Sequence, residues 1–346
     1  MIEYSYITIY CNTTPCVCQP LAAKGTLIMA IKIILWTLSV ALALAAVALI
    51  TAFICYMRVF YSPKRKPVGE DEYPLPPGKV YEPHYDDMIA WMKQIRAMPH
   101  ESIKIKSHDG LTLSGNYYEY APDAPIELLF HGYQGSGERD LSAGVERCFA
   151  IGRSAIIIDQ RSHGASEGCT TTFGVKERFD CLAWINYVSE RFGKDKKIIL
   201  TGVSMGAATV MMAAGEELPD NVVCVLADCG YSSARAIIKK VIAEMGLPAN
   251  LLYPFVRLGA LVFGRFNLEE TSPIEAVSRA KIPIIFIHGD TDDFVPHYMS
   301  AELYEACTSE HKSFVTSPGA GHGLAYPINK ELYINALRDF EKEAGF

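Results

Sequence analysis

The sequence has little clustered positive charge, and it has no motif that holds a phosphate-bearing cofactor. Its formal charge is −7, and its one dense basic run, residues 64–66, stands beside a hydrophobic stretch. Nucleic-acid binding needs clustered Lys and Arg, so the composition argues against nucleic acid as the main partner. There is no metal-ligand cluster, no P-loop and no G-x-G-x-x-G after a strand, so no cofactor is implied.

Paired cysteines are also scarce. The six cysteines beyond residue 58 form no C-x-x-C pair, and no His stands at zinc-finger spacing from them. Scattered free thiols suit a reducing compartment better than an oxidising one. Near the start, Cys16 and Cys18 could form a redox or metal pair, or belong to a loose N-terminal tail.

Charge is absent from one long segment, residues 33–57. As a helix it would be long enough to cross the ~30 Å hydrocarbon core of a bilayer. Trp36 near one end, with Tyr56 and Tyr61 at the other, are placed as interfacial anchors. A cleaved signal peptide is the alternative, but the apolar residues continue well past the length of its hydrophobic region. The segment therefore predicts a retained transmembrane helix.

Flanking charge predicts how this helix is oriented. Lys24 and Lys32 precede it, whereas Arg58 and the basic run 64–66 follow it. The more basic side of a span stays in the cytoplasm. We expect a single-pass membrane protein with its C-terminal part in the cytoplasm.

The rest of the chain alternates short strands with helical stretches. Residues 1–32 are expected to be an N-terminal tail, 58–100 a proline-rich linker with a lead-in helix, and 101–346 one domain. Two alternating stretches followed by continuous apolar runs predict an α/β fold, with a mostly parallel central sheet covered by helices on both faces. The expected strands are 102–106, 111–118, 126–130, 154–159, 197–201, 222–227, 282–287 and 313–316.

Residues 229–281 interrupt this alternation with two or three helical stretches and are the expected place of a lid. Within them, residues 251–255 and 258–263 are apolar with little polar relief. Two interpretations stay open: ordinary packing on the edge of the sheet, or a cap that faces a membrane or lipid.

One serine stands between a predicted strand and a predicted helix. Gly202-Val203-Ser204-Met205-Gly206 follows strand 197–201 and precedes the helical run 207–214. This is the G-x-S-x-G pattern in the strand–turn–helix setting that presents a nucleophilic serine. The flanking glycines permit the sharp turn that this setting requires.

The loop after strand 126–130 is the candidate oxyanion hole. It reads Phe130-His131-Gly132-Tyr133-Gln134-Gly135. The backbone N–H groups of Tyr133 and Met205 are expected to bind a developing oxyanion. His131 precedes those donors, so we interpret it as a residue that holds the loop rather than as a base.

Candidates for the acid and the base follow the last two strands. Asp290, Asp292 and Asp293 come after strand 282–287, and spacing alone does not choose among them. His322 stands in Gly-Ala-Gly-His-Gly after the final strand. A carboxylate that orients a histidine, which in turn activates a serine, is the arrangement of nucleophilic acyl transfer.

Together these motifs carry a family resemblance over residues 100–345. The chain resembles α/β-hydrolases of the serine-aminopeptidase-like group, including the Bem46-like hydrolases, and its residues 159–168 resemble that group's D-x-R-x-H-G-x-S-x-G segment. The group's H-G-x-x-D-x-x-V-P pattern selects Asp292, and its glycine-flanked histidine selects His322. The resemblance implies an α/β-hydrolase fold with a short helical lid, and relatives that include esterases, lipases, thioesterases and peptidases.

We therefore predict a serine hydrolase with Ser204 as nucleophile, His322 as base and Asp292 as orienting acid. The expected substrate is a small-molecule ester or thioester with an apolar acyl group, because an apolar lid is expected beside a membrane anchor. One alternative is an aminopeptidase-like amide hydrolase that holds the substrate amine with Glu269 and Glu270. The other is a non-catalytic α/β-hydrolase that serves as a binding scaffold.

Overall fold

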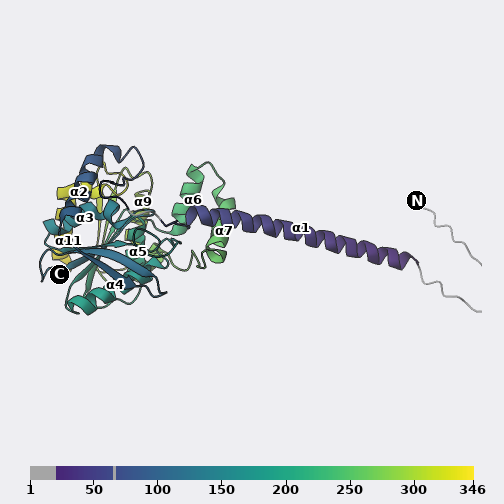
Figure 1. Cartoon of the computed structure of the whole chain (residues 1–346), viewed down its shortest axis with the longest axis horizontal. Helices are drawn as coiled ribbons and strands as arrows, with labels where there is room; N and C mark the ends of the chain where they lie inside the picture. Colours follow the sequence, from purple (N-terminus) through teal and green to yellow (C-terminus); the bar gives the residue numbers. More distant parts are fainter. Residues whose placement is uncertain (1–20, 65–67) are drawn as a thin grey trace, which may run out of the picture. The chain divides into compact units, whose positions relative to one another are not determined.

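The computed structural model describes residues 21–64 and 68–346 (Figure 1). The chain forms two compact units, residues 1–50 and residues 51–346. The pair Cys16 and Cys18 and the flanking basic residues Arg65 and Lys66 lie outside the described residues.

The chain begins its described part with one long helix, α1 (Leu21–Val59). Its segment Thr26–Val59 has a mean hydropathy of 2.6 and is long and apolar enough, by length and composition, to cross a membrane. The expected span of residues 33–57 lies within it. The helix extends further at both ends because the flanking residues are mostly good helix formers as well.

The second unit contains an eight-stranded sheet in the order β1-β2-β4-β3-β5-β6-β7-β8. Strand β2 pairs antiparallel with both β1 and β4, and the remaining pairs are parallel. The prediction of an antiparallel start followed by a mostly parallel sheet is therefore confirmed. The strands are β1 (Glu101–Lys106), β2 (Thr112–Tyr118), β3 (Ile126–Phe130), β4 (Ser154–Asp159), β5 (Ile198–Val203), β6 (Val222–Asp228), β7 (Ile284–Gly289) and β8 (Lys312–Ser317).

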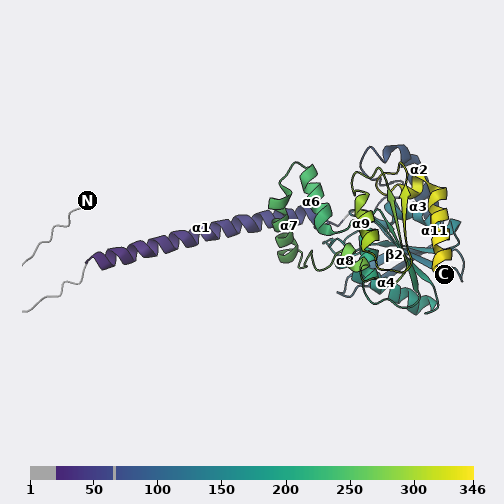
Figure 2. The same ribbon diagram turned by 180° about the vertical axis from the view of Figure 1, so that it is seen from behind.

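Helices cover both faces of this sheet (Figures 1 and 2). On one face, side chains such as Leu128, Leu200 and Phe286 pack against α4, α5 and α9, and on the other, Leu129, Ile157 and Leu226 pack against α3 and α11. Alternate residues of each central strand thus enter opposite cores, which is why these strands read as continuous apolar runs. The helices are α3 (Gly137–Ala150), α4 (Glu177–Phe192), α5 (Met205–Ala214), α9 (Tyr298–Ala306), α10 (Ala325–Ile328) and α11 (Lys330–Ala344).

The lead-in helix belongs to the second unit rather than to a separate linker. Helix α2 (Tyr85–Ala97), which follows the short 3-10 turn Glu82–His84, buries Trp91, Met92 and Ile95. Ile95 packs in the same cluster as Leu141 of α3. The boundary expected at residue 100 is therefore not a boundary of the structure, because α2 is part of the core of the unit that it precedes.

Three helices lie between β6 and β7, where the insertion was expected: α6 (Ala234–Glu244), α7 (Ala249–Val262) and α8 (Pro273–Val277). Their buried side chains, such as Ile237 and Val256, share one cluster with Met205 of α5 and Phe60 just after α1. Helix α7 also comes close to α1, because a Cβ added to Gly259 would lie 2.5 Å from the backbone oxygen of Ala52.

Candidate active site

Ser204 occupies a strained turn between β5 and α5. Its backbone angles are φ 58° and ψ −114°, in the left-handed half of the map where non-glycine residues are uncommon. A Cβ added to Gly202 would lie 2.1 Å from the Gly206 carbonyl carbon, and one added to Gly206 would lie 2.0 Å from the Phe130 oxygen. Both glycines are therefore required for the turn to close, and the turn directs the serine side chain to the carboxyl edge of the sheet.

The structure brings the three predicted side chains into one hydrogen-bonded chain. His322 Nε2 lies 2.9 Å from Ser204 Oγ, and His322 Nδ1 lies 2.7 Å from Asp292 Oδ2. With its proton on Nδ1, the ring donates to Asp292 and accepts from the serine hydroxyl. The three residues come from the ends of different strands, β5, β7 and β8, which meet because parallel strands end at one edge of the sheet.

Asp292 is held in place by more than His322. Its Oδ1 accepts from the backbone N–H groups of Phe294 at 2.9 Å and Val295 at 2.8 Å, and its Oδ2 lies 3.1 Å from His288 Nε2. Burial by itself would raise the pKa of Asp292, but the hydrogen bonds from His288 and His322 outweigh it and hold that pKa well below its usual value. The carboxyl is therefore ionised and aimed at His322, as an orienting acid has to be.

The other two aspartates of the same loop, Asp290 and Asp293, are exposed and have different surroundings. Asp290 is exposed and accepts from the backbone N–H of Gly319 at 2.6 Å, which ties the loop after β7 to the loop after β8. Asp293 is exposed at the mouth of the cavity described below.

His288 is a functional neighbour that motif reading did not single out. It is fully buried, and its Nδ1 lies 2.6 Å from Ser300 Oγ while its Nε2 faces Asp292. It therefore contacts the same carboxylate oxygen of Asp292 that His322 contacts. In the sequence, His288 is recognisable only as the first residue of the pattern His288-Gly289-Asp290.

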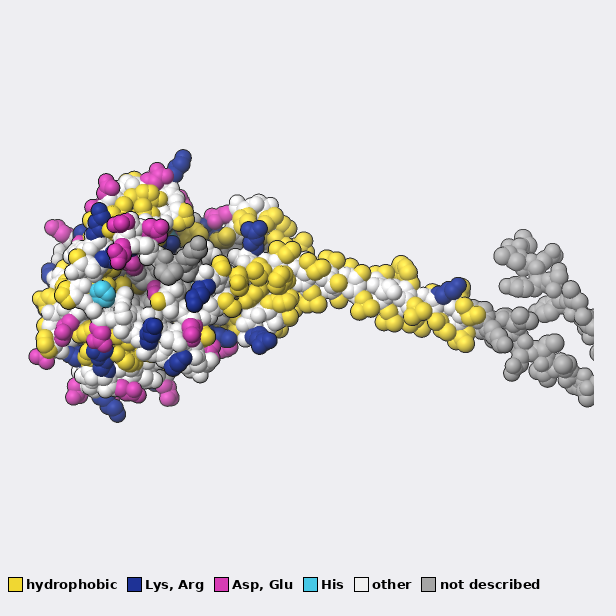
Figure 3. Space-filling view, in the orientation of Figure 1, with side chains coloured by type: hydrophobic (Ala, Val, Ile, Leu, Met, Phe, Trp, Pro, Cys, Tyr) yellow, Lys and Arg dark blue, Asp and Glu magenta, His cyan; other side chains and the backbone are white. Residues whose placement is uncertain are grey.

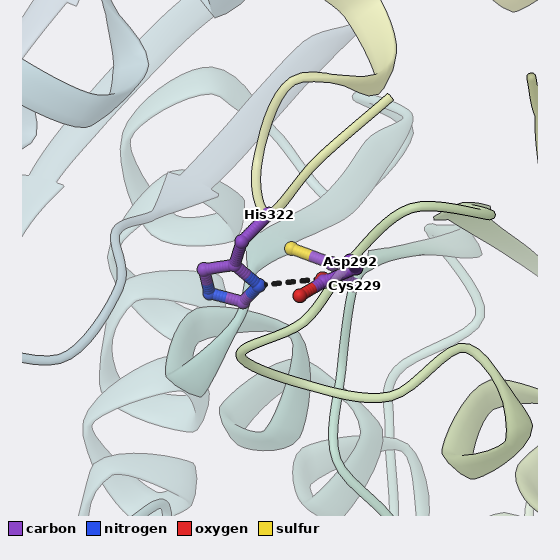
Figure 4. A group of neighbouring side chains, drawn as sticks. All are labelled: Cys229, Asp292 and His322. Atoms are coloured by element: carbon purple, nitrogen blue, oxygen red, sulfur yellow. Dashed lines mark hydrogen bonds and ion pairs between the residues drawn. The ribbon is translucent and has the colours of Figure 1, made fainter. Parts of the chain in front are cut away.

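Cys229 is a second neighbour that sequence reasoning missed. It follows Asp228 directly after β6, is buried with φ 45°, and its sulfur lies beside Asp292 and the ring of His322 (Figure 4). Burial raises the pKa of the Cys229 thiol well above its usual value, so it stays protonated and is not a nucleophile.

Among residues 21–64 and 68–346, two groups of side chains have donor atoms close enough together to hold a metal ion. In each, the donor atoms lie within 4.8 Å of one another: Cys229, Asp292 and His322 form the first, and His108, Asp109 and Asp180 the second. In the first group, Asp292 and His322 are already bonded to each other. In the second, both aspartates pair with the guanidinium of Arg161, which supplies the positive charge that they need.

The loop after β3 lies against Ser204. A Cβ added to Gly132 would be 3.5 Å from Ser204 Cβ. His131 is buried, and its Nε2 accepts from the backbone N–H of Gln160 at 3.0 Å, so it ties this loop to β4. Tyr133 turns its hydroxyl away to donate to the Val59 carbonyl oxygen at 2.8 Å, at the end of α1. Met205, the first residue of α5, follows Ser204 in the chain, and Tyr133 follows Gly132, the residue that lies against Ser204.

A cavity of about 440 Å³ opens beside Ser204 and His322. Its volume is that of a small-molecule site. Its walls are largely apolar, and Asp228, Arg147 and Tyr333 are polar residues along its lining. The apolar and aromatic lining residues include Val80, Trp91, Leu129, Leu141, Val203, Phe294 and Tyr326.

The cover of this cavity comes from a segment that the sequence did not predict. The lining includes residues 76–78, 80 and 81 before α2 and two residues of α2 itself, whereas none of its residues lies in 229–281. Val80 reaches the histidine loop, because a Cβ added to Gly321 would lie 2.7 Å from Val80 Cγ2. The expectation that residues 229–281 close over the site is therefore corrected: these helices pack against α5 and the end of α1 instead.

Comparisons with known proteins find a matching family and several relatives. A model of the prolyl oligopeptidase family matches residues 166–344. Among curated proteins, the uncharacterized protein YqkD of Bacillus subtilis is 27% identical over 191 residues, 55% of this chain. The matched part spans 62% of YqkD's length. An uncharacterized membrane protein of Saccharomyces cerevisiae is 27% identical over 57% of this chain and 63% of its own length.

Two further likenesses cover more of the chain. The protein bem46 of Schizosaccharomyces pombe is 25% identical over 65% of this chain and 71% of its own length. Among solved structures, the esterase Pf2001 of Pyrococcus furiosus superposes with a TM-score of 0.58 at 24% identity, over 81% of this chain and 99% of its own. At that identity the superposition establishes the fold alone.

Proposed function

The chain belongs to the prolyl oligopeptidase family of α/β-hydrolases, and on that premise we propose that it is a serine hydrolase that transfers an acyl group to water through Ser204. The observation that carries the proposal is the continuous chain from Ser204 Oγ through His322 to Asp292, with distances of 2.9 and 2.7 Å. This is the geometry that nucleophilic acyl transfer requires.

The reaction follows from the positions of these groups. His322 Nε2 takes the Ser204 proton while Oγ attacks the substrate carbonyl carbon, and the imidazolium is stabilised by ionised Asp292. The Tyr133 and Met205 N–H groups receive the oxyanion of the tetrahedral intermediate. When the intermediate collapses, His322 returns the proton to the leaving alcohol or thiol. A water molecule then repeats the sequence on the acyl-enzyme and releases the acid.

We take the substrate to be a small ester or thioester with an apolar acyl group. The support is the cavity beside Ser204, whose walls include Leu129, Leu141 and Val203 and which can accept an acyl chain of moderate size. Residues 229–281, the apolar segment expected to form a lid, do not line this cavity. The preference for an apolar acyl group therefore rests on the residues of the cavity wall.

Amide hydrolysis is the second candidate, and the family favours it as much as ester hydrolysis. Glu269 and Glu270, the carboxylates first considered for binding an amine, do not line the cavity. Glu269 pairs with Arg257 and Glu270 with Arg178. A peptidase reaction would have to use a carboxylate of the cavity lining instead: Asp228, Asp293 or Asp140, the last of which pairs with Arg139. The assembled side chains argue against a non-catalytic scaffold, which needs no serine–histidine bond.

We also propose that α1 anchors the protein in a membrane and that the hydrolase unit faces the cytoplasm. The support is the 34-residue apolar segment Thr26–Val59, the basic residues that follow it, and the likeness to a yeast membrane protein.

The test is labelling of the detergent-solubilised chain with a fluorophosphonate, which reacts with an activated serine. We expect labelling and turnover of p-nitrophenyl esters in the parent and their loss in Ser204→Ala. The control is Ser102→Ala, which replaces an exposed serine on β1 and should keep both activities. Octanoyl esters should be turned over faster than acetyl esters. A folded parent protein that neither labels nor hydrolyses any ester, thioester or aminoacyl amide would refute the proposal.

A further inference from the structure

Helix α7 is apolar on both of its sides. It buries Tyr253, Val256, Gly259 and Ala260 against its own unit. Its opposite side carries Leu251 and Leu261, which are 64% and 60% exposed. A helix that is apolar all round is normally enclosed by protein or by lipid. The buried side is accounted for by protein contacts, and the exposed side therefore needs an apolar neighbour of its own.

The exposed side is part of a larger apolar surface. Met245 and Leu247, in the turn between α6 and α7, are 68% and 43% exposed, and Val262 at the end of α7 is 44% exposed. Figure 3 shows hydrophobic side chains gathered over α6 and α7, with basic side chains beside them. We call these residues the cap patch: Met245, Leu247, Leu251, Leu261 and Val262.

The cap patch is carried by a helix that packs on the last turns of α1. A Cβ added to Gly259 would lie 2.5 Å from the Ala52 oxygen, and the rings of Phe53 and Phe263 are 5.1 Å apart. Ala52 precedes Val59, the last residue of the apolar segment, by seven positions. At 1.5 Å per residue this is about 10 Å along the helix axis. If α1 crosses a bilayer, α7 must lie at about that depth, near the boundary of its hydrocarbon core.

The length and charge of this region fit an interfacial position. With 14 residues, α7 is only about 21 Å long and cannot cross a bilayer by itself. Residues 245–268 contain two arginines, Arg257 and Arg265, and no Asp or Glu. Both arginines are exposed. An apolar face bordered by basic side chains suits the junction of acyl chains and anionic headgroups.

The geometry points to the cap patch as a second membrane contact, inserted into the same bilayer face from which α1 emerges. Its occupant is lipid: acyl chains against Leu251 and Leu261, and headgroup phosphates against Arg265, since Arg257 pairs with Glu269 at 2.8 Å. The inference rests on the proposed membrane anchoring by α1 and is independent of the proposed hydrolysis. It also assigns a role to the apolar helices inserted between β6 and β7. They do not act as a lid on the cavity, because residues 229–281 do not line it.

Tryptophan fluorescence in vesicles tests this directly. The full chain is reconstituted into phosphatidylcholine–phosphatidylglycerol vesicles, with or without phospholipids brominated near the headgroup end of the acyl chain. The variants are Leu251→Trp and Leu261→Trp. The control is Leu332→Trp, which is 42% exposed on α11. A thermal unfolding transition close to that of the parent, followed by far-ultraviolet circular dichroism, shows that each variant is folded.

Brominated lipid should lower the added emission of Leu251→Trp and Leu261→Trp by at least about twofold and leave that of Leu332→Trp unchanged. Equal emission with and without bromine at both α7 positions would overturn the inference, whether the patch then faces water, a second copy or another protein.

Fluorescence of the parent chain distinguishes failure of the cap patch inference from failure of the proposed membrane anchor. Trp36 in α1 is 68% exposed, whereas Trp91 and Trp184 are buried. Trp36 stands near one end of the expected span, so quenching of the parent by lipid brominated near the headgroup end of the acyl chain reports that α1 is in the membrane. If Trp36 is quenched and the α7 positions are not, only the cap patch inference is wrong. If Trp36 is not quenched either, the anchor proposal and the inference fall together.

Discussion

At the scale of single residues, Asp292 differs from its neighbours by its contacts rather than by its chemistry. Its carboxylate receives two backbone N–H groups and faces two histidines. In Asp292→Asn, an amide replaces the acceptor of the His322 Nδ1 proton, so the ring loses the tautomer that can accept the serine proton. We expect kcat for p-nitrophenyl esters to fall by about 10⁴-fold with little change in KM.

The control for this prediction is Asp290→Asn. Asp290 is an exposed carboxylate in the same loop and bonds only to a backbone N–H across the loops in the described part of the chain. Its replacement should change kcat less than about tenfold, since it does not touch His322. Equal losses in the two variants would contradict the assignment of the acid.

Glu127 is a buried charge on which part of the α3 core depends. It is fully buried on β3, bonded to the guanidinium groups of Arg147 and Arg153 and, at 2.6 Å, to the hydroxyl of Thr201. Replacement by Gln would remove the carboxylate that Arg147 pairs with and would leave Arg153 only its second partner, the partly exposed Glu341. Breaking a buried ion pair in this way costs about 3–5 kcal/mol, so the free energy of unfolding of Glu127→Gln at neutral pH should fall by about that amount. Urea denaturation measures it.

The acid range gives an independent check on Glu127. Burial would raise its pKa, but the two arginines lower it from 4.5 to about 2. Because the folded value lies below the unfolded one, this stabilisation is complete above pH 4.5 and is lost as the pH falls towards 2. The penalty of Glu127→Gln should therefore shrink over that interval. Glu101→Gln, which removes an exposed partner of Arg191, should change stability little at any pH.

At the scale of elements, Gly259 sets how closely α7 packs on α1. Helix propensity alone predicts that Gly259→Ala stabilises α7 by about 1 kcal/mol. The added methyl group would lie 2.5 Å from the Ala52 oxygen and 3.2 Å from the Tyr56 nitrogen, both backbone atoms that cannot rotate away. We expect the steric term to dominate, so that the melting temperature falls and limited proteolysis between residues 245 and 265 becomes faster.

Gly69→Ala is the matched variant for this prediction. Its new methyl group would meet only the flexible side chain of Glu72, at 3.4 Å, and should leave both measurements unchanged. A rise in the melting temperature of Gly259→Ala would mean that α7 does not rest on α1 as described.

At the scale of the whole molecule, membrane orientation decides which substrates the site can meet. Basic residues follow the apolar segment, which predicts that the unit carrying Ser204 lies in the cytoplasm. Cys169 is an exposed thiol of that unit. A membrane-impermeant maleimide should label it in permeabilised cells and not in intact ones, with Cys169→Ser as the reference for signal from other thiols. Labelling of Cys169 in intact cells would place the unit on the outer side.

Local sequence determined the strands, the serine turn and the order of the candidate site residues. Each of these depends on neighbours in the chain: apolar runs mark buried strands, and Gly202 and Gly206 permit the turn at Ser204. Parallel strands end at one edge of a sheet, so residues that follow different strands could be expected to meet there. The structure brings Ser204, Asp292 and His322 together at that edge.

Tertiary structure alone decided what surrounds those residues. Sequence spacing did not show which of Asp290, Asp292 and Asp293 is the acid, and in the sequence only the family pattern selected Asp292. The structure distinguishes Asp292 by its contacts with His288 and His322. The sequence left two interpretations of α7 open, ordinary packing on the edge of the sheet or a cap that faces a membrane or lipid, because its hydrophobicity does not say which apolar surface it will meet. Helix α7 contacts Ala52, and the segment before α2 covers the cavity. Both contacts join segments far apart in the chain, so neither leaves a local sequence pattern.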